Sequence, residues 1–471
     1  MPQRRSHVAP SAAQTELAAA LAALRESLDA PIEFPAAVLA EAEAATITSP
    51  TLDLREVPFA TLDPLGSRDL DQAFHLEKGG AGYTVRYAIA DVPGFVAPGG
   101  AVDLEARRRG QTIYAADGTI PLHPPVLSED RASLLPDVDR PALVWTFALD
   151  SEGAVTEFRL ERALIRSRAQ LDYVAAQAAL DRGEGGPASL LPEIGALRIE
   201  QERLRGGASL NLPDEEVVRT PDGGYAIERR HPLPVEEWNA QLSLMTGMAA
   251  ASLMLDAGCG ILRTMPQPED TAFEAFRHQT EALGRPWTTG RYGDYLRELD
   301  RSDPMTLPIL EAAASLFRGA GYVAFDGESP DDAAQSAIAA PYAHVTAPLR
   351  RLVDRWALTI CLAVSEGRDI PAWVRESLDE LPALMQESGR RASALDAATT
   401  NAVEAALLAP LVGTVLEATV VEVRGERAIV QIAEPAVTAS APLPAGAMPG
   451  STVSLRVVRS DIASGEIELA V

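Results

Sequence analysis

The stretch Thr61-Leu-Asp-Pro-Leu-Gly-Ser-Arg-Asp-Leu-Asp-Gln-Ala-Phe-His75 places Asp63, Asp69 and Asp71 within nine residues, between two apolar, strand-like segments. The turn residues 64–66 are expected to bring the three carboxylates together. Their like charges would repel strongly in a low-dielectric cleft unless a hard divalent cation neutralised them. Mg²⁺ or Mn²⁺ prefers oxygen ligands of this kind. The alternative is a polar surface loop whose Asp side chains cap turns.

Further blocks follow this stretch in a fixed order. Tyr83-Thr-Val-Arg-Tyr-Ala-Ile-Ala-Asp-Val-Pro-Gly-Phe-Val96 reads as a strand and a turn, and Tyr342-Ala-His-Val-Thr-Ala-Pro-Leu-Arg-Arg351 is followed by Asp354. Shorter blocks at 104–110, 112–114, 163–167 and 171–173 lie between them. Together with the Asp-x5-Asp-x-Asp spacing, they resemble the signatures of the RNase II family of 3′ to 5′ exoribonucleases. The resemblance covers roughly residues 50 to 380, and several ordered blocks are more specific than one motif.

The resemblance implies both a fold and an activity. The fold class is α+β, with an RNase II-type catalytic domain in which helices flank a central sheet. The activity is hydrolytic 3′ to 5′ degradation of single-stranded RNA to nucleoside 5′-monophosphates by a divalent-metal mechanism. The expected cofactor is Mg²⁺, with Mn²⁺ as an alternative. Two such ions can activate water and stabilise the charge that develops during phosphodiester hydrolysis.

The family pattern also assigns residues to the reaction. It implies that Asp69, Asp71 and Arg350 are catalytic, and that Asp63, Asp69, Asp71 and Gln72 bind metal. Asp71 is expected to be the most important carboxylate, and Arg350 would stabilise charge on the scissile phosphate. Gln72 stands where the family usually has a fourth Asp. An amide oxygen can ligate a cation but adds no negative charge, so the second ion is expected to bind weakly or only with substrate.

A further set of residues is expected to bind RNA: Tyr114, Tyr173, Glu237, Arg350 and Arg351. The resemblance implies that Tyr114 stacks on a terminal base and that Tyr173 recognises a ribose. Either tyrosine could instead be a core residue. Glu236 or Glu237 would accept a hydrogen bond from a 2′-hydroxyl group, and we favour Glu237, although a Glu at a helix start is also ordinary capping chemistry.

Two more expectations concern the surroundings of the RNA. Asp354 is expected to orient Arg350. Val217 aligns by eye with an aromatic residue that closes on the last base in relatives. We therefore expect a looser grip on the 3′ end, with a different shortest product or lower processivity.

Three domains are predicted along the 471 residues: a helical N-terminal module at 1–48, the catalytic domain at 49–408 and an S1/OB-like barrel at 409–471. Residues 1–10 are expected to be disordered, and helices are expected over 12–28 and 35–45. These helices leave no room for the cold-shock-type barrels that many relatives carry ahead of the catalytic domain. The last segment predicts five alternating strands, yet it has no Phe, Tyr or Trp to stack on bases. We expect it to wall a channel more than to grip RNA.

Composition limits the classes of function. A net charge of −26 disfavours a protein that coats nucleic acid, but it permits an enclosed RNA channel lined by a few of the forty arginines. Cys259 and Cys361 lack metal-ligand spacing, so zinc is not expected. No apolar run approaches the roughly 18 residues of a membrane helix, and no signal-type apolar core follows the N-terminus. We expect a cytoplasmic monomer.

Two rival functions remain open at this point. One is a catalytically weak or inactive relative that binds RNA or regulates, suggested by Gln72, Val217 and the barrel without aromatic residues. The other is a different metal-dependent phosphoesterase with a shallow, open cleft.

Overall fold

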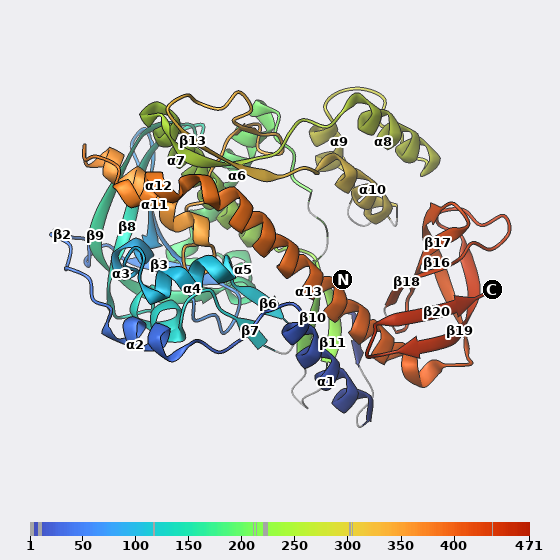
Figure 1. Cartoon of the computed structure of the whole chain (residues 1–471). Helices are drawn as coiled ribbons and strands as arrows, with labels where there is room; N and C mark the ends of the chain where they lie inside the picture. Colours follow the sequence, from blue (N-terminus) through green and yellow to red (C-terminus); the bar gives the residue numbers. More distant parts are fainter. Residues whose placement is uncertain are drawn as a thin grey trace.

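The computed structural model describes residues 4–7, 12–115, 118–210, 212, 214–219, 225–300, 303, 305–435 and 437–471. It has a mixed α+β architecture, in which a central sheet is flanked by helices and a second, all-β unit lies at the C-terminal end (Figure 1). The predicted fold class is therefore confirmed. In the part of the chain described, no helix is both long and apolar enough to cross a membrane.

The central sheet is built from six strands in the order β2-β9-β3-β4-β5-β8. Because β9 also pairs with β8, five of these strands form a closed ring. The remaining strand, β2, pairs with β9 and is not part of the ring. The 18-residue β9 makes this possible, since its first part pairs with β8 and its last part with β3. The strands are β2 (Leu52–Asp53), β3 (Phe59–Asp63), β4 (Gln72–Gly79), β5 (Gly82–Ala90), β8 (Asp139–Asp150) and β9 (Val155–Asp172).

Helices α7 (Pro234–Ala257) and α11 (Leu352–Ser365) pack on this ring. The largest hydrophobic cluster joins Trp145 and Phe147 of the sheet to Met245 of α7 and Trp356 of α11. Burial of such large apolar side chains is the main source of stability in a core of this kind. The same cluster includes residues at the starts of α6 and α13, and two smaller clusters lie beside it, one under the acidic stretch and one among α8, α9 and α10.

The remaining helices lie around the ring and beyond it. They are α2 (Ala36–Ala44), α3 (Val92–Phe95), α4 (Ala101–Arg109), α5 (Tyr173–Asp181), α6 (Leu191–Arg205), α8 (Asp270–Ala282), α9 (Tyr292–Glu298), α10 (Thr306–Ala313), α12 (Ala372–Ser377) and α13 (Leu381–Leu408). Short 3-10 turns cover Gly186–Ala188, Ala314–Leu316, Leu378–Glu380 and Ala409–Leu411, and a π-helical turn covers Leu127–Arg131. The small two-stranded pairings use β6 (Ile113–Ala115), β7 (Gly118–Ile120), β12 (Cys259–Thr264), β13 (Gly321–Asp326), β14 (Ala334–Gln335) and β15 (Ala340–Pro341).

The N-terminal region confirms the two predicted helices and corrects one expectation. Helix α1 covers Ala12–Ser27, and α2 follows close to its predicted bounds. Residues 1–10 were expected to be disordered, but β1 (Arg4–His7) pairs antiparallel with β11 (Tyr225–Arg230), which in turn pairs with β10 (Asp214–Arg219). A strand of four residues gives no clear pattern by itself, because its stability depends on the partner strand.

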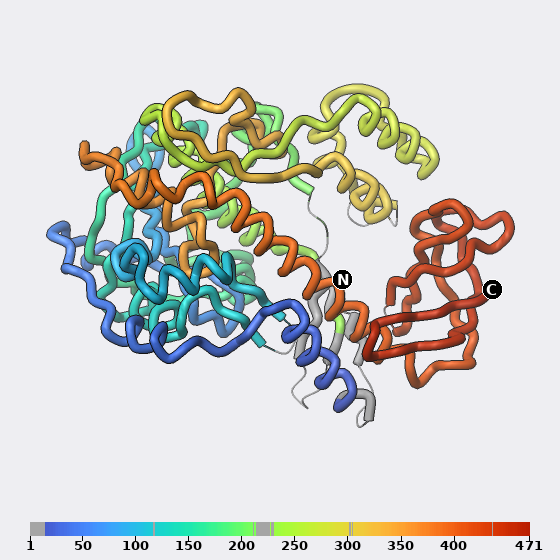
Figure 2. Tube along the Cα trace, in the orientation of Figure 1, coloured from blue at the N-terminus to red at the C-terminus, as the bar shows by residue number. Residues whose placement is uncertain are grey.

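The C-terminal unit has the five strands that the sequence predicts, in the order β18-β17-β16-β19-β20. They are β16 (Val415–Arg424), β17 (Arg427–Ile432), β18 (Val437–Pro442), β19 (Thr452–Asp461) and β20 (Glu466–Ala470). Its core includes Val430 and Leu455, and the same cluster contains Leu17 of α1 and Leu407 of α13. Figure 2 shows the long α13 leading from the catalytic region to this barrel, with α1 crossing near its end.

Candidate active site

The acidic stretch forms the connection between two neighbouring strands of the ring. Asp63 is the last residue of β3 and Gln72 is the first residue of β4. The register of β3 against β9 sets Asp63 beside Asp172, directly before Tyr173. Sheet pairing therefore fixes both ends of the loop and brings a predicted RNA-binding tyrosine to the same edge.

A serine distant in sequence holds the middle of this loop. Ser133 accepts a hydrogen bond from the backbone N–H of Leu70 at 3.0 Å and donates to the carbonyl of Arg68 at 2.6 Å. The backbone N–H of Leu134 also donates to the carbonyl of Leu70 at 3.0 Å. These bonds hold Leu70 in its buried position between Asp69 and Asp71. The second half of the loop is thus tied into the domain, whereas residues 64–66 are exposed.

Asp71 is almost completely buried, with 2% of its surface exposed. Its Oδ1 accepts a hydrogen bond from the backbone N–H of Leu349 at 2.7 Å, whereas its Oδ2 lies 3.5 Å from Nε of Arg350 and accepts none from the described residues. Burial raises the pKa of Asp71 to about 8 and that of Asp63 to about 6. Asp63 likewise has a buried Oδ2 without a hydrogen-bond donor among the described residues.

These features fit a divalent cation, because two buried carboxylates retain oxygens with no donor and burial disfavours their charge. The charge of Asp69 raises the pKa of both groups further, so the three carboxylates lie within electrostatic reach of one another. In the side-chain positions described, however, no three His, Cys, Asp or Glu groups converge on one point. Asp69 instead accepts a hydrogen bond from the hydroxyl group of Tyr114 at 2.7 Å.

Both polar atoms of the side-chain amide of Gln72, which we predicted as a metal ligand, form hydrogen bonds within the protein. Its Nε2 donates to the carbonyl of Thr346 at 2.6 Å, and its Oε1 accepts from the hydroxyl group of Tyr87. The side chain therefore links β4 to the segment 342–351, and that segment continues to α7 through a bond between the hydroxyl groups of Ser243 and Thr346 at 2.7 Å. Metal ligation by Gln72 stays a prediction.

The two neighbouring arginines have different surroundings. Arg350 approaches Asp71 while 40% of its side chain stays exposed, so its guanidinium can still contact a ligand. Arg351 makes two bonds of 2.9 Å to Asp354, which also accepts from the backbone N–H of Ala347. Our expectation that Asp354 orients Arg350 is wrong. The i, i+3 spacing at the start of α11 places its carboxylate on Arg351 instead.

Two glycines let distant segments approach the arginines. Gly110 ends α4 at φ 74°, where a Cβ would lie 2.4 Å from the Cβ of Ser388. Its carbonyl accepts the backbone N–H of Leu352 at 3.0 Å. In α7, a Cβ on Gly247 would lie 2.1 Å from the ring of Tyr342. A side chain at either place would displace the segment that carries Arg350 and Arg351.

The two predicted tyrosines approach the acidic loop at different points: Tyr114 contacts Asp69, and Tyr173 follows Asp172, the register partner of Asp63. Tyr114 is 55% exposed, so its ring can stack on a base while its hydroxyl group contacts Asp69. Tyr173 packs partly against the main core, and burial raises its pKa to about 12, while the nearby side chain of Asn239 lowers it. Asn239 was not predicted. The i, i+3, i+7 spacing of Glu236, Asn239 and Ser243 on one helix could have indicated it.

The structure separates the two candidate glutamates. Glu236 caps α7 through the backbone N–H of Leu233 and pairs with Arg230 at 2.6 Å, and its charge raises the pKa of Tyr173. Glu237 lines a different cavity of about 350 Å³ between α6, α7, α9 and α10. The structure therefore brings Glu236, and not the favoured Glu237, towards the tyrosine. The side chain of Val217 lies outside the described residues.

Comparisons with known proteins agree with this architecture. An RNB domain model matches residues 51–363, and a model of the RNase II-type exonuclease C-terminal S1 domain matches residues 414–471. Ribonuclease R of Escherichia coli is 28% identical over 341 residues, which cover 67% of this chain and 41% of that protein. Exosome complex exonuclease RRP44 homolog A of Arabidopsis thaliana is 31% identical over 323 residues, covering 64% of this chain and 34% of that protein. The chain thus spans less than half of these curated relatives.

Solved structures show the same fold at low sequence identity. Mycoplasma genitalium RNase R in complex with ribose-methylated single-stranded RNA matches with a TM-score of 0.86 at 16% identity, covering 97% of this chain and 78% of that one. Yeast Ssd1, a pseudonuclease, matches with a TM-score of 0.69 at 18% identity over 83% of this chain and 50% of that one. Nucleases with an RNB domain are hydrolases that use divalent metal ions. With an RNB domain followed by the matching S1 domain, the chain belongs to the RNase II family of exoribonucleases.

Proposed function

We propose that the protein is a hydrolytic exoribonuclease that degrades single-stranded RNA from the 3′ end to nucleoside 5′-monophosphates. The observation that carries the proposal is the placement of Asp71. Its carboxylate is buried, is aligned by the N–H of Leu349 and faces Arg350, while one oxygen accepts no hydrogen bond from the described residues. A purely structural carboxylate at that depth would have its hydrogen bonds satisfied.

Different residues would bind the metal, stabilise charge on the phosphate and stack on the terminal base. Asp63, Asp69 and Asp71 would hold Mg²⁺ or Mn²⁺, which when bound supplies an activated water and charge stabilisation. Arg350 supplies a fixed positive charge for the equatorial phosphate oxygens, because Asp71 restrains its guanidinium without neutralising it fully. Tyr114 offers its exposed ring to the terminal base.

The residues that would recognise the ribose of the RNA lie around Tyr173. Tyr173 and Asn239 form a polar pair that can bond to a ribose hydroxyl group, with Glu236 close enough to affect the tyrosine. Arg351, held by Asp354, fixes the backbone beside Arg350 and contributes to RNA binding mainly through this positioning.

A catalytically weak or inactive RNA-binding protein is the second candidate. It is favoured by Gln72, whose amide bonds to Tyr87 and Thr346 in place of a charged ligand, and by the fold likeness to a pseudonuclease. Three retained carboxylates and Arg350 favour the active enzyme.

A 5′-labelled single-stranded RNA incubated with Mg²⁺ separates the two candidates. A ladder that shortens from the 3′ end, is lost in Asp71→Asn, persists in the exposed control Asp181→Asn and is absent with matched DNA supports the exoribonuclease. If the native protein cuts no RNA but Gln72→Asp does, the chain is a binding protein that lost a ligand. Cleavage of DNA or small phosphoesters without RNA cleavage would refute both.

A further inference from the structure

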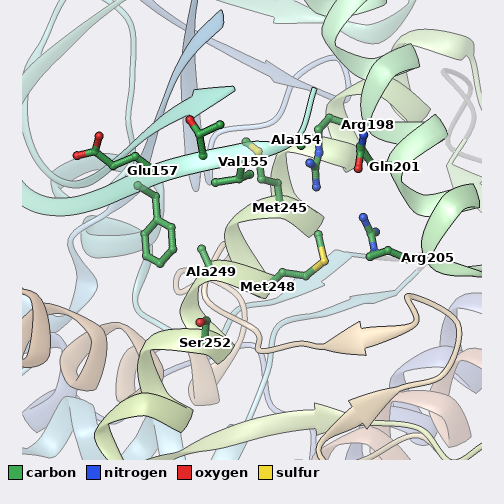
Figure 3. A pocket seen from close by; sticks show the side chains of 12 residues that line it. Ala154, Val155, Glu157, Arg198, Gln201, Arg205, Met245, Met248, Ala249 and Ser252 are labelled. Atoms are coloured by element: carbon green, nitrogen blue, oxygen red, sulfur yellow. The ribbon is translucent and has the colours of Figure 1, made fainter. Parts of the chain in front are cut away.

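A cavity of about 420 Å³ lies at the start of β9, between α6 and α7 (Figure 3). It is separate from the acidic loop, because Asp63 pairs with the opposite end of β9. The cavity is lined by Met245, Met248 and Ser252, whose helical spacing places them on one face of α7. Ser243, which contacts the active-site segment, lies on the opposite face of the same helix.

Two arginines of α6 line this cavity, and neither forms an ion pair with an acidic residue in the described part of the chain. Arg198 is 4% exposed, and its Nη1 donates to the carbonyl of Gly153 at 2.8 Å, whereas its Nε has no acceptor among the described residues. Arg205 has two buried nitrogens, Nε and Nη2, that likewise lack an acceptor in the described part of the chain. A buried guanidinium without an acceptor is costly, so such a group usually has a ligand or an ion pair.

The acidic groups nearby compensate the two arginines only in part: burial lowers the pKa of both and the charge of Glu202 raises it, but Glu202 forms no ion pair with either among the described residues. Glu202 is one turn from each of them on α6, but its carboxylate already accepts from Arg297 at 2.9 Å and from Gln241 at 2.8 Å. Glu157 also lines the cavity, yet its side chain is exposed and lies on the far side from the arginines in Figure 3. The cavity is therefore a local positive site in a chain with a net charge of −26.

The two guanidinium groups also repel each other. Burial, followed by the charge of Arg205, lowers the pKa of Arg198 to about 10, and burial also lowers the pKa of Arg205. Like charges in one cavity are favourable only when an opposite charge lies between them. Phosphates and carboxylates match the planar donors of Arg.

Much of the remaining wall of the cavity is apolar, although Thr156, Gln201 and Ser252 also line it. Phe158, Met245 and Met248 line the cavity, and Figure 3 shows Met248 on the side of Arg205. Methionine side chains adapt to the shape of a ligand and make favourable contacts with aromatic rings. We propose that this cavity binds a small organic anion, in which a phosphate or carboxylate contacts Arg198 and Arg205 and an apolar or aromatic group packs on Phe158, Met245 and Met248. The volume is typical of small-molecule sites.

Calorimetric titration of the full chain tests the proposal with phenylphosphonate, phenylacetate, inorganic phosphate and the neutral benzyl alcohol. We expect at least one phenyl anion to bind more tightly than phosphate and than benzyl alcohol, and the tighter of the two identifies the anionic group. Arg205→Gln should weaken this binding by about tenfold or more, the effect of losing hydrogen bonds to a charged group.

Arg203→Gln is the matched control, because it removes the same charge from the same helix. Arg203 forms an exposed pair with Glu200 at 2.6 Å and does not line the cavity. Its variant should bind the anion as the native protein does. The proposal is overturned if neither phenyl anion binds the native protein at millimolar concentrations, or if Arg205→Gln binds as well as Arg203→Gln. If inorganic phosphate binds as tightly as the phenyl anions, the apolar part of the proposed site is refuted. If benzyl alcohol binds as tightly as they do, the anion-binding part is refuted.

Discussion

Asp71→Asn should stabilise the metal-free protein at neutral pH, although it removes a residue of the candidate site. Burial raises the pKa of Asp71 to about 8 in the folded chain, whereas Asp in an unfolded chain titrates near about 3.9. Between these values the folded protein keeps a proton that the unfolded chain releases. The free energy of unfolding therefore falls as the pH rises through this window.

The size of the effect follows from the width of the window. A pH of 7 is about three units above the pKa of this carboxyl in the unfolded chain, and each unit corresponds to about 1.4 kcal/mol of unfolding free energy. Through this one group, the free energy of unfolding of the native protein is thus lower at pH 7 than at acidic pH by up to about 4 kcal/mol. The Asn variant has no such loss, because Asn does not titrate. We expect the variant to be more stable by up to this amount at pH 7, and the difference to vanish near pH 4.

Urea unfolding in the presence of EDTA measures this difference, followed by the fluorescence of buried tryptophans such as Trp145 and Trp356. The exposed control Asp181→Asn should stay within about 0.5 kcal/mol of the native protein at each pH. Added Mg²⁺ should stabilise the native protein but not Asp71→Asn, because only the native site offers the carboxylate. A variant that is less stable than the native protein at pH 7, or a difference that does not change with pH, would refute the reasoning.

Three further predictions concern other contacts. Arg355→Met removes the guanidinium that lies 2.5 Å from the buried carboxylate of Asp103, which keeps Arg107 and the N–H of Gly99, and should cost about 1–3 kcal/mol of unfolding free energy in urea. Tyr114→Ala should weaken single-stranded RNA binding by about 1–3 kcal/mol in a fluorescence anisotropy titration, with little change in thermal midpoint because the ring is exposed. Gln72→Leu leaves two hydrogen-bond partners unsatisfied and should cost about 1–3 kcal/mol for each, measured by the same unfolding assay.

The acidic loop could be predicted from sequence because its members are close along the chain. Asp63, Asp69 and Asp71 occupy one stretch, and strand patterns on both sides fix where it begins and ends. The hydrogen bond that aligns Asp71 comes from Leu349, which is 278 residues away. No spacing rule connects such residues, so only the resemblance of ordered blocks indicated that both belong to one site.

The errors have local physical causes. The assignment of Asp354 to Arg350 overlooked helix geometry, in which a carboxylate reaches back three residues to Arg351. The choice between Glu237 and Glu236 stays a prediction, because it depends on rotation about the axis of α7, which a sequence without a known helix start cannot supply. The strand β1 was missed because its partner β11 lies more than two hundred residues further along the chain.

The ring closure by β9 also predicts where the chain can tolerate changes in length during evolution. Side chains alternate along a strand, so one inserted residue within β9 would turn every following side chain to the other face. Asp172 would then lose its place beside Asp63, and Tyr173 would leave the edge of the acidic loop. The turn between β8 and β9, at 151–154, lies at the far end of the strand and can absorb an insertion without shifting this register. Homologous chains should therefore vary in length at that turn and keep the length of β9 constant.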